Sequence, residues 1–141
     1  VVVIVILGIL AVTAAPRFLN LQDDAKESAL QGLAGAMNGA AGIVYGKAAI
    51  AGLEASAAAS ITENNVTINT VLGYPAATST GIGNATDMDG FDIVNPGSTG
   101  EGQTVAYGFA GYSDFCVRYT AATSSSQATA RVVSGAAGVC K

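Results

Sequence analysis

The chain has 141 residues, half of them hydrophobic, and its 6 Lys and Arg against 10 Asp and Glu give a net charge of −4. This length allows one soluble domain at most, in addition to an apolar segment. The acidic balance and the absence of any cluster of Lys and Arg argue against a nucleic-acid interface. The sequence has no His, no nucleophile motif and no phosphate-binding glycine loop, so we expect no enzyme activity and no catalytic residue.

The chain begins with an apolar run, residues 1–15, which carries no charge. Such a segment has to be buried, either in a bilayer or in protein. As a helix it would rise about 22 Å, which is short of the roughly 30 Å hydrocarbon core of a bilayer. Because the sequence does not begin with Met, we expect further residues in front that complete a span of about 20.

An amphipathic helix is predicted over residues 17–51. Apolar side chains recur at helical spacing along one stripe, which consists of Leu21, Ala25, Leu30, Leu33, Met37 and Val44. We expect this stripe to face the folded domain.

A row of glycines lies nearly opposite that stripe on the same predicted helix: Gly32, Gly35, Gly39, Gly42 and Gly46. Each glycine lowers helix stability by roughly 0.5–1 kcal/mol relative to Ala. We expect the row to form a close-packing groove for another helix or backbone, as small residues do between helices in membranes. The alternative is chance, because the segment is rich in Ala and Gly.

The region 52–102 is predicted to be mostly loop, because it contains many turn signals and a single strand-like run, Val66–Leu72. Within it, Asp87, Asp89 and Asp92 lie beside Gly90 and offer the hard oxygen ligands that Ca²⁺ prefers. Their spacing departs from the EF-hand pattern, so the competing interpretation is a solvated acidic turn. No other metal or cofactor is expected.

Alternation with a period of two begins at Thr104 and predicts an antiparallel sheet. Strands over 105–109 and 115–120 are expected to form a hairpin through the link Ala110–Asp114, and a third strand is expected over 129–133. Cys116 and Cys140 favour a disulfide over two reduced thiols, because an even count follows a membrane-directed segment. The expected fold class is α+β: a long helix whose C-terminal half packs on a small antiparallel sheet, with a disulfide-closed region at 103–141.

The opening run VVVIVILGILAVTAAPRFLNLQDDAK, together with AMNGAAGIVYGKAA over 36–49, closely resembles the N-terminal helix of type IV pilins. The rest of the chain agrees with that family in plan, including a Cys pair near the C-terminus. In the family, a prepilin peptidase cuts before a Phe-Thr-Leu-Ile-Glu-Leu segment, and the new N-terminus is methylated. That segment is not in this sequence, so these steps map onto no residue here.

The resemblance implies a structural protein with an apolar arm, residues 1–16, and a globular pilin domain, residues 17–141. The arm is expected to hold the subunit in the inner membrane before assembly and to form the filament core afterwards, through Val1, Val2, Val3, Ile4, Val5, Ile6, Leu7, Ile9, Leu10 and Val12. In filaments of the family the helix loses its regular turns between the positions matching Gly8 and Pro16. The missing N–H of Pro16 independently favours such a break.

The partners that the resemblance implies are copies of the chain in a helical homopolymer, the pilus assembly machinery, and a host or abiotic surface. The expected location is an extracellular surface filament. We also expect Arg17 to pair with Asp23 or Asp24 of the same or an adjacent subunit. Two other interpretations remain open: a pseudopilin of a type II secretion system, and a membrane-tethered binding domain that never polymerises.

Overall fold

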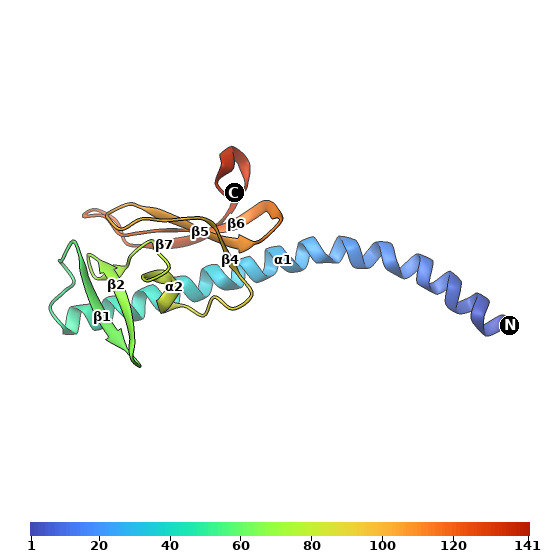
Figure 1. Ribbon diagram of the computed structural model, residues 1–141, viewed down its shortest axis with the longest axis horizontal. Helices are drawn as coiled ribbons and strands as arrows, with labels where there is room; N and C mark the ends of the chain where they lie inside the picture. The colour runs from blue at the N-terminus through green and yellow to red at the C-terminus, as the bar shows by residue number, and fades with distance from the viewer.

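One long helix and two antiparallel sheets are the main elements of the molecule (Figure 1). The computed structural model describes residues 1–12, 21–136 and 138–141. Helix α1, Val2–Ile50, lies with its C-terminal half against both sheets, and its N-terminal end extends away from them. The fold class is α+β, as predicted, and a disulfide joins Cys116 to Cys140 near the C-terminus.

The buried stripe of α1 follows the predicted helical spacing from Leu30 onward. Leu30 and Met37 are completely buried, and Leu33 and Val44 are at most 4% exposed. Truncating a buried Leu or Met to Ala typically lowers the free energy of unfolding by about 2–5 kcal/mol. This stripe therefore contributes much of the free energy that holds the helix on the sheets. The prediction was wrong for Leu21 and Ala25, which are both exposed.

The first sheet has the strand order β1-β2-β3, with β1 at Ala59–Glu63, β2 at Val66–Val71 and β3 at Tyr74–Pro75. A two-residue turn joins β1 to β2, and both of its residues, Asn64 and Asn65, have positive φ. Asparagine tolerates this left-handed conformation better than most residues, and it suits the twist of a hairpin. The sheet covers the C-terminal end of α1, where Ile61 and Ile68 pack on Val44 and Ala48.

The structure therefore differs from the prediction of a loop over 52–102. That region contains the first sheet, the short helix α2 at Ile82–Ala85, and strand β4 at Asp92–Asn95. These elements are short, and their exposed positions include apolar residues such as Val66 and Ile93, so they show little of the alternation that identifies a strand. The predicted strand at Val66–Leu72 is confirmed as β2, which ends at Val71.

The second sheet has the strand order β4-β5-β6-β7 and is antiparallel throughout, with β5 at Thr104–Phe109, β6 at Tyr112–Thr120 and β7 at Thr129–Ser134. The predicted hairpin and third strand are confirmed. The predicted five-residue link was too long, because Phe109 pairs with Tyr112 across a two-residue turn in which Gly111 has a φ of 77°. Val105, Tyr107, Val117 and Tyr119 belong to the core that this sheet shares with α1.

The C-terminal segment, including the 3-10 helix η1 at Ala136–Gly138, follows β7 and returns to the sheet. Ala106, Cys116 and Cys140 form a small buried cluster there, with Val94, Val133 and Val139 packed against it. The second sheet thus has the α1 core on one face and, on the other, a small cover tied down by the disulfide.

Candidate functional site

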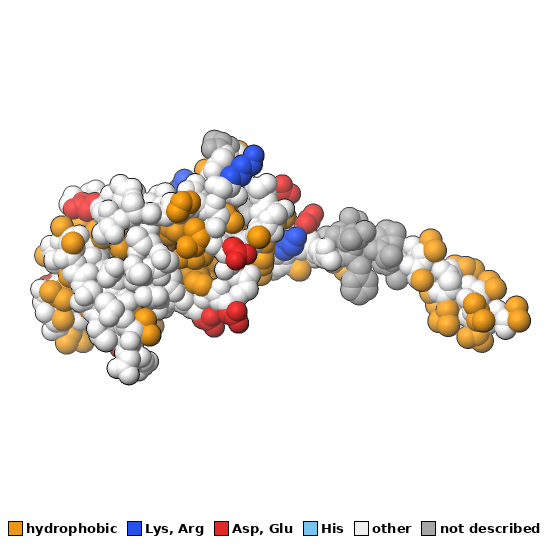
Figure 2. Space-filling view, viewed as in Figure 1, with side chains coloured by type: hydrophobic (Ala, Val, Ile, Leu, Met, Phe, Trp, Pro, Cys, Tyr) orange, Lys and Arg blue, Asp and Glu red, His pale blue; other side chains and the backbone are white. Residues whose placement is uncertain are grey.

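The N-terminal end of α1 exposes a continuous apolar surface. Ten aliphatic side chains of residues 1–12 range from 52% exposed at Ile6 to 100% exposed at Val1. Figure 2 shows hydrophobic atoms covering this end of the helix. A soluble monomer seldom exposes so much contiguous apolar surface unless a partner or a membrane covers it. These are the ten residues predicted to form a filament core.

Within the residues that the structure describes, no helix has an apolar stretch long enough to cross a bilayer.

The predicted helix break concerns the assembled filament and stays a prediction. In the single chain, Gly8 and residues 9–12 belong to α1. Pro16 and Arg17 lie outside the described residues, so the proposed pair of Arg17 with Asp23 or Asp24 does too. Both aspartates are exposed.

The five glycines of the predicted groove on α1 all face solvent, away from both sheets. A Cβ placed on any of Gly32, Gly35, Gly39, Gly42 or Gly46 would meet no atom within 4 Å. Alanine would therefore fit sterically at each position and would favour the helix by roughly 0.5–1 kcal/mol. The packing of the single chain does not explain why these positions are glycine. Ile43, 65% exposed, and Ile50, 89% exposed, are apolar neighbours along the same part of the helix.

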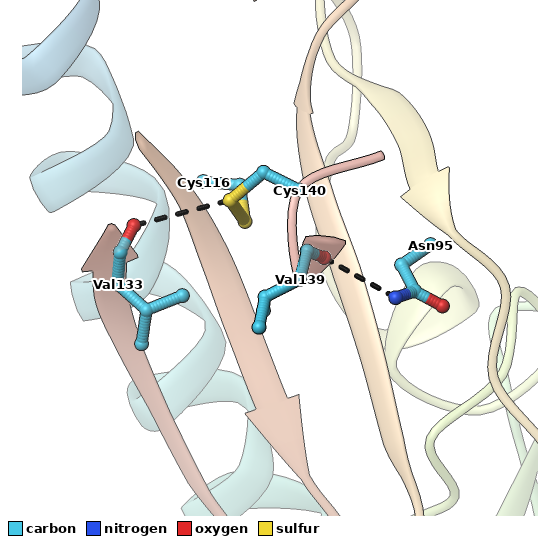
Figure 3. Close-up of a disulfide and its surroundings, with 5 residues drawn as sticks. All are labelled: Asn95, Cys116, Val133, Val139 and Cys140. Atoms are coloured by element: carbon cyan, nitrogen blue, oxygen red, sulfur yellow. Dashed lines mark hydrogen bonds between the residues drawn. A yellow bond between two sulfur atoms is a disulfide. The ribbon is translucent and has the colours of Figure 1, made fainter. Parts of the chain in front are cut away.

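The disulfide fastens the C-terminal segment to the second sheet (Figure 3). The Cα atoms of Cys116 and Cys140 are 5.6 Å apart, and the two side chains are 0% and 3% exposed. Asn95 of β4 donates a hydrogen bond from Nδ2 to the carbonyl oxygen of Val139, at 3.2 Å. The Sγ atom of Cys140 also lies 3.9 Å from the carbonyl oxygen of Val133. The segment therefore contacts β4, β6 and β7 and holds both edges of the sheet together.

The structure does not gather the three aspartates of the predicted calcium site. Asp87 accepts a hydrogen bond at Oδ1 from the backbone N–H of Asp89, at 3.0 Å, which shapes a local turn. Among the described residues, no group of three or more His, Cys, Asp or Glu side chains is placed to hold a metal ion. Asp87, Asp89 and Asp92 therefore do not form such a group. All three carboxylates are exposed.

An aromatic and acidic surface lies where α1 leaves the second sheet. The Nζ atom of Lys26 lies 4.8 Å from the ring centroid of Tyr112, a cation–π contact between the helix and β6. Burial, followed by the charges of Asp23, Asp114, Glu27 and Asp24, raises the pKa of Tyr112. Lys26 and these carboxylates thus lie around the same ring.

An open groove of about 550 Å³ lies at the opposite end of the domain and was missed from the sequence. Tyr45 and Tyr74 stack in its wall, with ring centroids 4.5 Å apart. Burial is the larger cause that raises the pKa of Tyr74, and the electrostatic effect of Tyr45 is the smaller one. Glu54 and the loop 123–127 line the rest. Its residues come from α1 and the segment after it, from the β2–β3 turn with β3, and from the β6–β7 loop, so no local sequence motif predicts it.

A long N-terminal helix packed on antiparallel sheet, with a disulfide near the C-terminus, is a pilin-like architecture. Comparison with known proteins adds no relative, because no protein-family model, no curated protein and no solved structure matches the chain.

Proposed function

We propose that this chain is the structural major subunit of a type IV pilus, a surface filament that mediates attachment to cells and surfaces. The resemblance of residues 1–26 and 36–49 points more narrowly to the major subunit of the mannose-sensitive haemagglutinin pilus. The observation that carries the proposal is the exposed arm: ten aliphatic side chains on a helix whose other half is firmly docked on a disulfide-closed domain.

The same arm serves two environments in this proposal. In the inner membrane, a helix satisfies its own backbone hydrogen bonds, which lipid cannot do. In the filament, the arms of many copies pack together and exchange lipid contacts for protein contacts. Burying one Val, Leu or Ile side chain is worth about 1.5–3 kcal/mol relative to water, so the arm passes directly from lipid into the filament core.

The partners in this proposal are copies of the chain, the assembly machinery, and the host or abiotic surface that the exposed domain meets. The assembled protein is located outside the cell. The glycine row of α1 supports the proposal, since its openness in the single chain suits a second helix that approaches closely in the assembly.

A type II secretion pseudopilin is the second candidate, because it would share the apolar arm and build a short periplasmic filament. A tethered domain that never polymerises is the third. In that case, removal of residues 1–16 would leave the function of the domain intact.

The test is to shear cells that make the protein, collect the released filaments and determine their structure by cryo-electron microscopy. We expect long filaments in which residues 1–12 lie at the axis and the second sheet of each subunit faces outward. The matched variant Ile6→Asp places a charge in the arm and leaves the domain unchanged, so the folded protein should remain in the cell envelope without filaments. Wild-type protein found in the envelope alone, with no filament containing it, would contradict the proposal.

A further inference from the structure

Two arginines face each other across the β6–β7 ladder. Arg118 is the direct antiparallel partner of Arg131. Their neighbours Val117 and Tyr119 belong to the core shared with α1, so the arginines lie on the outer face of the sheet. Like charges directly opposite each other destabilise a sheet. The next outward pair is Thr120 and Thr129, which adds two hydroxyl groups beside the arginines.

No carboxylate of the described chain neutralises this pair. The ion pair found among the described residues joins Lys47 to Glu63, on α1 and β1. Arg131 is exposed, whereas the Nε atom of Arg118 is buried without a hydrogen-bond partner. Two cationic side chains directly opposite each other, without a counter-charge among the described residues, are unfavourable, so a carboxylate from another molecule would stabilise the pair.

Carboxylates that form no ion pair with any described residue occur at the opposite edge of the same sheet. β7, with Arg131, is one edge strand, and β4, which begins at Asp92, is the other. Asp87 and Asp89 lie in the segment that leads into β4, and the hydrogen bond between them fixes its turn. This segment runs along the lower edge of the domain, away from β7, and acidic atoms gather there (Figures 1 and 2).

We propose that Arg118 and Arg131 of one subunit bind the carboxylates of the 87–92 segment of a second copy of this chain. The inference rests on the proposed function, because a helical polymer needs two different, complementary patches on one subunit. The acidic group around Asp23 and Asp24 fits this role less well, since Lys26 already lies within it. An arginine fork binds a carboxylate through two parallel hydrogen bonds, which would set the register between neighbouring subunits.

The experiment is a charge exchange in the full chain, expressed in cells whose sheared filaments are quantified against the cellular pool of subunit. Arg131→Glu and Asp89→Lys should each lower filament yield by about tenfold or more, and the double variant should restore most of it. Both positions are exposed, so the variants should fold. Lys141→Glu, which makes the same charge change on another exposed residue, should assemble like wild type.

If Arg131→Glu gives as many filaments as the wild type, the inference is overturned, whereas the presence of filaments still supports the proposed function. Loss in both single variants without recovery in the double variant would also overturn it, since the arginines and this segment would then not be partners. In the filament structure, a carboxylate of residues 87–92 within hydrogen-bonding distance of either guanidinium is the expected result. No filament from the wild type would overturn the proposed function and, with it, this contact.

Discussion

The side chain of Asn38 makes two hydrogen bonds to the backbone of Ala130. Its Nδ2 donates to the carbonyl oxygen of Ala130 at 2.8 Å, and its Oδ1 accepts from the N–H of Ala130 at 2.9 Å. Because β7 is an edge strand, Ala130 has no further strand to pair with on that side. The amide of Asn38 takes the place of that strand, and it thereby fixes the axial position of α1 against the sheet.

The first prediction is that Asn38→Ala lowers the free energy of unfolding by about 1–3 kcal/mol, because it leaves a partly buried N–H and C=O of Ala130 unpaired. Urea unfolding of the full chain in detergent, followed by circular dichroism, measures the change. Gln31→Ala is the control, since Gln31 is an exposed polar residue on the same helix and should have little effect. Equal stability of the two variants would show that the amide contact does not hold α1 in place.

The second prediction concerns Tyr119, which is completely buried and donates a hydrogen bond from its hydroxyl to the carbonyl oxygen of Pro75 at 2.6 Å. This bond joins β6 of the second sheet to β3 of the first. Tyr119→Phe should lower the free energy of unfolding by about 1–2 kcal/mol at neutral pH, because the carbonyl oxygen loses its partner.

The pH dependence of this variant provides a separate check. Burial raises the pKa of Tyr107 above its usual value of 10.0, and burial together with the nearby Tyr74 raises that of Tyr119. Below pH 10 both groups keep their protons in the folded and unfolded states. Above it the unfolded chain releases them first, so stability falls as pH rises toward the folded pKa values. Tyr119→Phe should lose less stability than wild type between pH ~10 and ~11.5, and an identical slope would contradict this.

Most of the second sheet and the buried stripe of α1 were predictable, because their apolar side chains repeat with the period of a strand or of a helix. β7 was predicted within one residue, and Leu30 and Met37 fell on the buried face, because large side chains recur at regular spacing there. Of the first sheet, only β2 was predicted from the sequence. Strand β1 contributes a single buried side chain, Ile61, and β3 has two residues and contains a proline.

The surfaces were predictable in unequal measure. The apolar arm is evident from composition alone, since residues 1–12 carry no charge. The arginine pair was not evident, because thirteen positions separate Arg118 from Arg131 and only the ladder register places them side by side. The groove beside Tyr45 and Tyr74 depends on three distant segments, and that arrangement exists only in the folded chain.

A third prediction concerns the disulfide, which closes a segment with a sequence separation of 24. Replacing both cysteines by Ser should lower the free energy of unfolding by about 3–4 kcal/mol in the chain-entropy model. Urea unfolding of the full chain measures it. In the wild type, both sulfurs are buried under the C-terminal segment, so a reductant should open the bond only when the domain unfolds. Rapid reduction of the folded protein would contradict this protected position.

The last prediction separates stability from assembly at the glycine row. Gly39 has open space around it in the single chain, so Gly39→Ala should raise the free energy of unfolding by roughly 0.5–1 kcal/mol, through helix propensity alone. Gly39→Leu should also leave the subunit folded, because its side chain would point into solvent. In a filament where another helix packs against the row, however, a leucine would hold the two backbones apart. We therefore expect Gly39→Leu to give a stable subunit and a several-fold lower filament yield, with Gly39→Ala assembling better than Gly39→Leu. Unfolding measurements in detergent and filament yields from sheared cells test both halves. If the Gly39→Leu subunit assembles as well as wild type, the groove has no role in assembly. The glycine row would then reflect only the Ala-rich and Gly-rich composition of the segment.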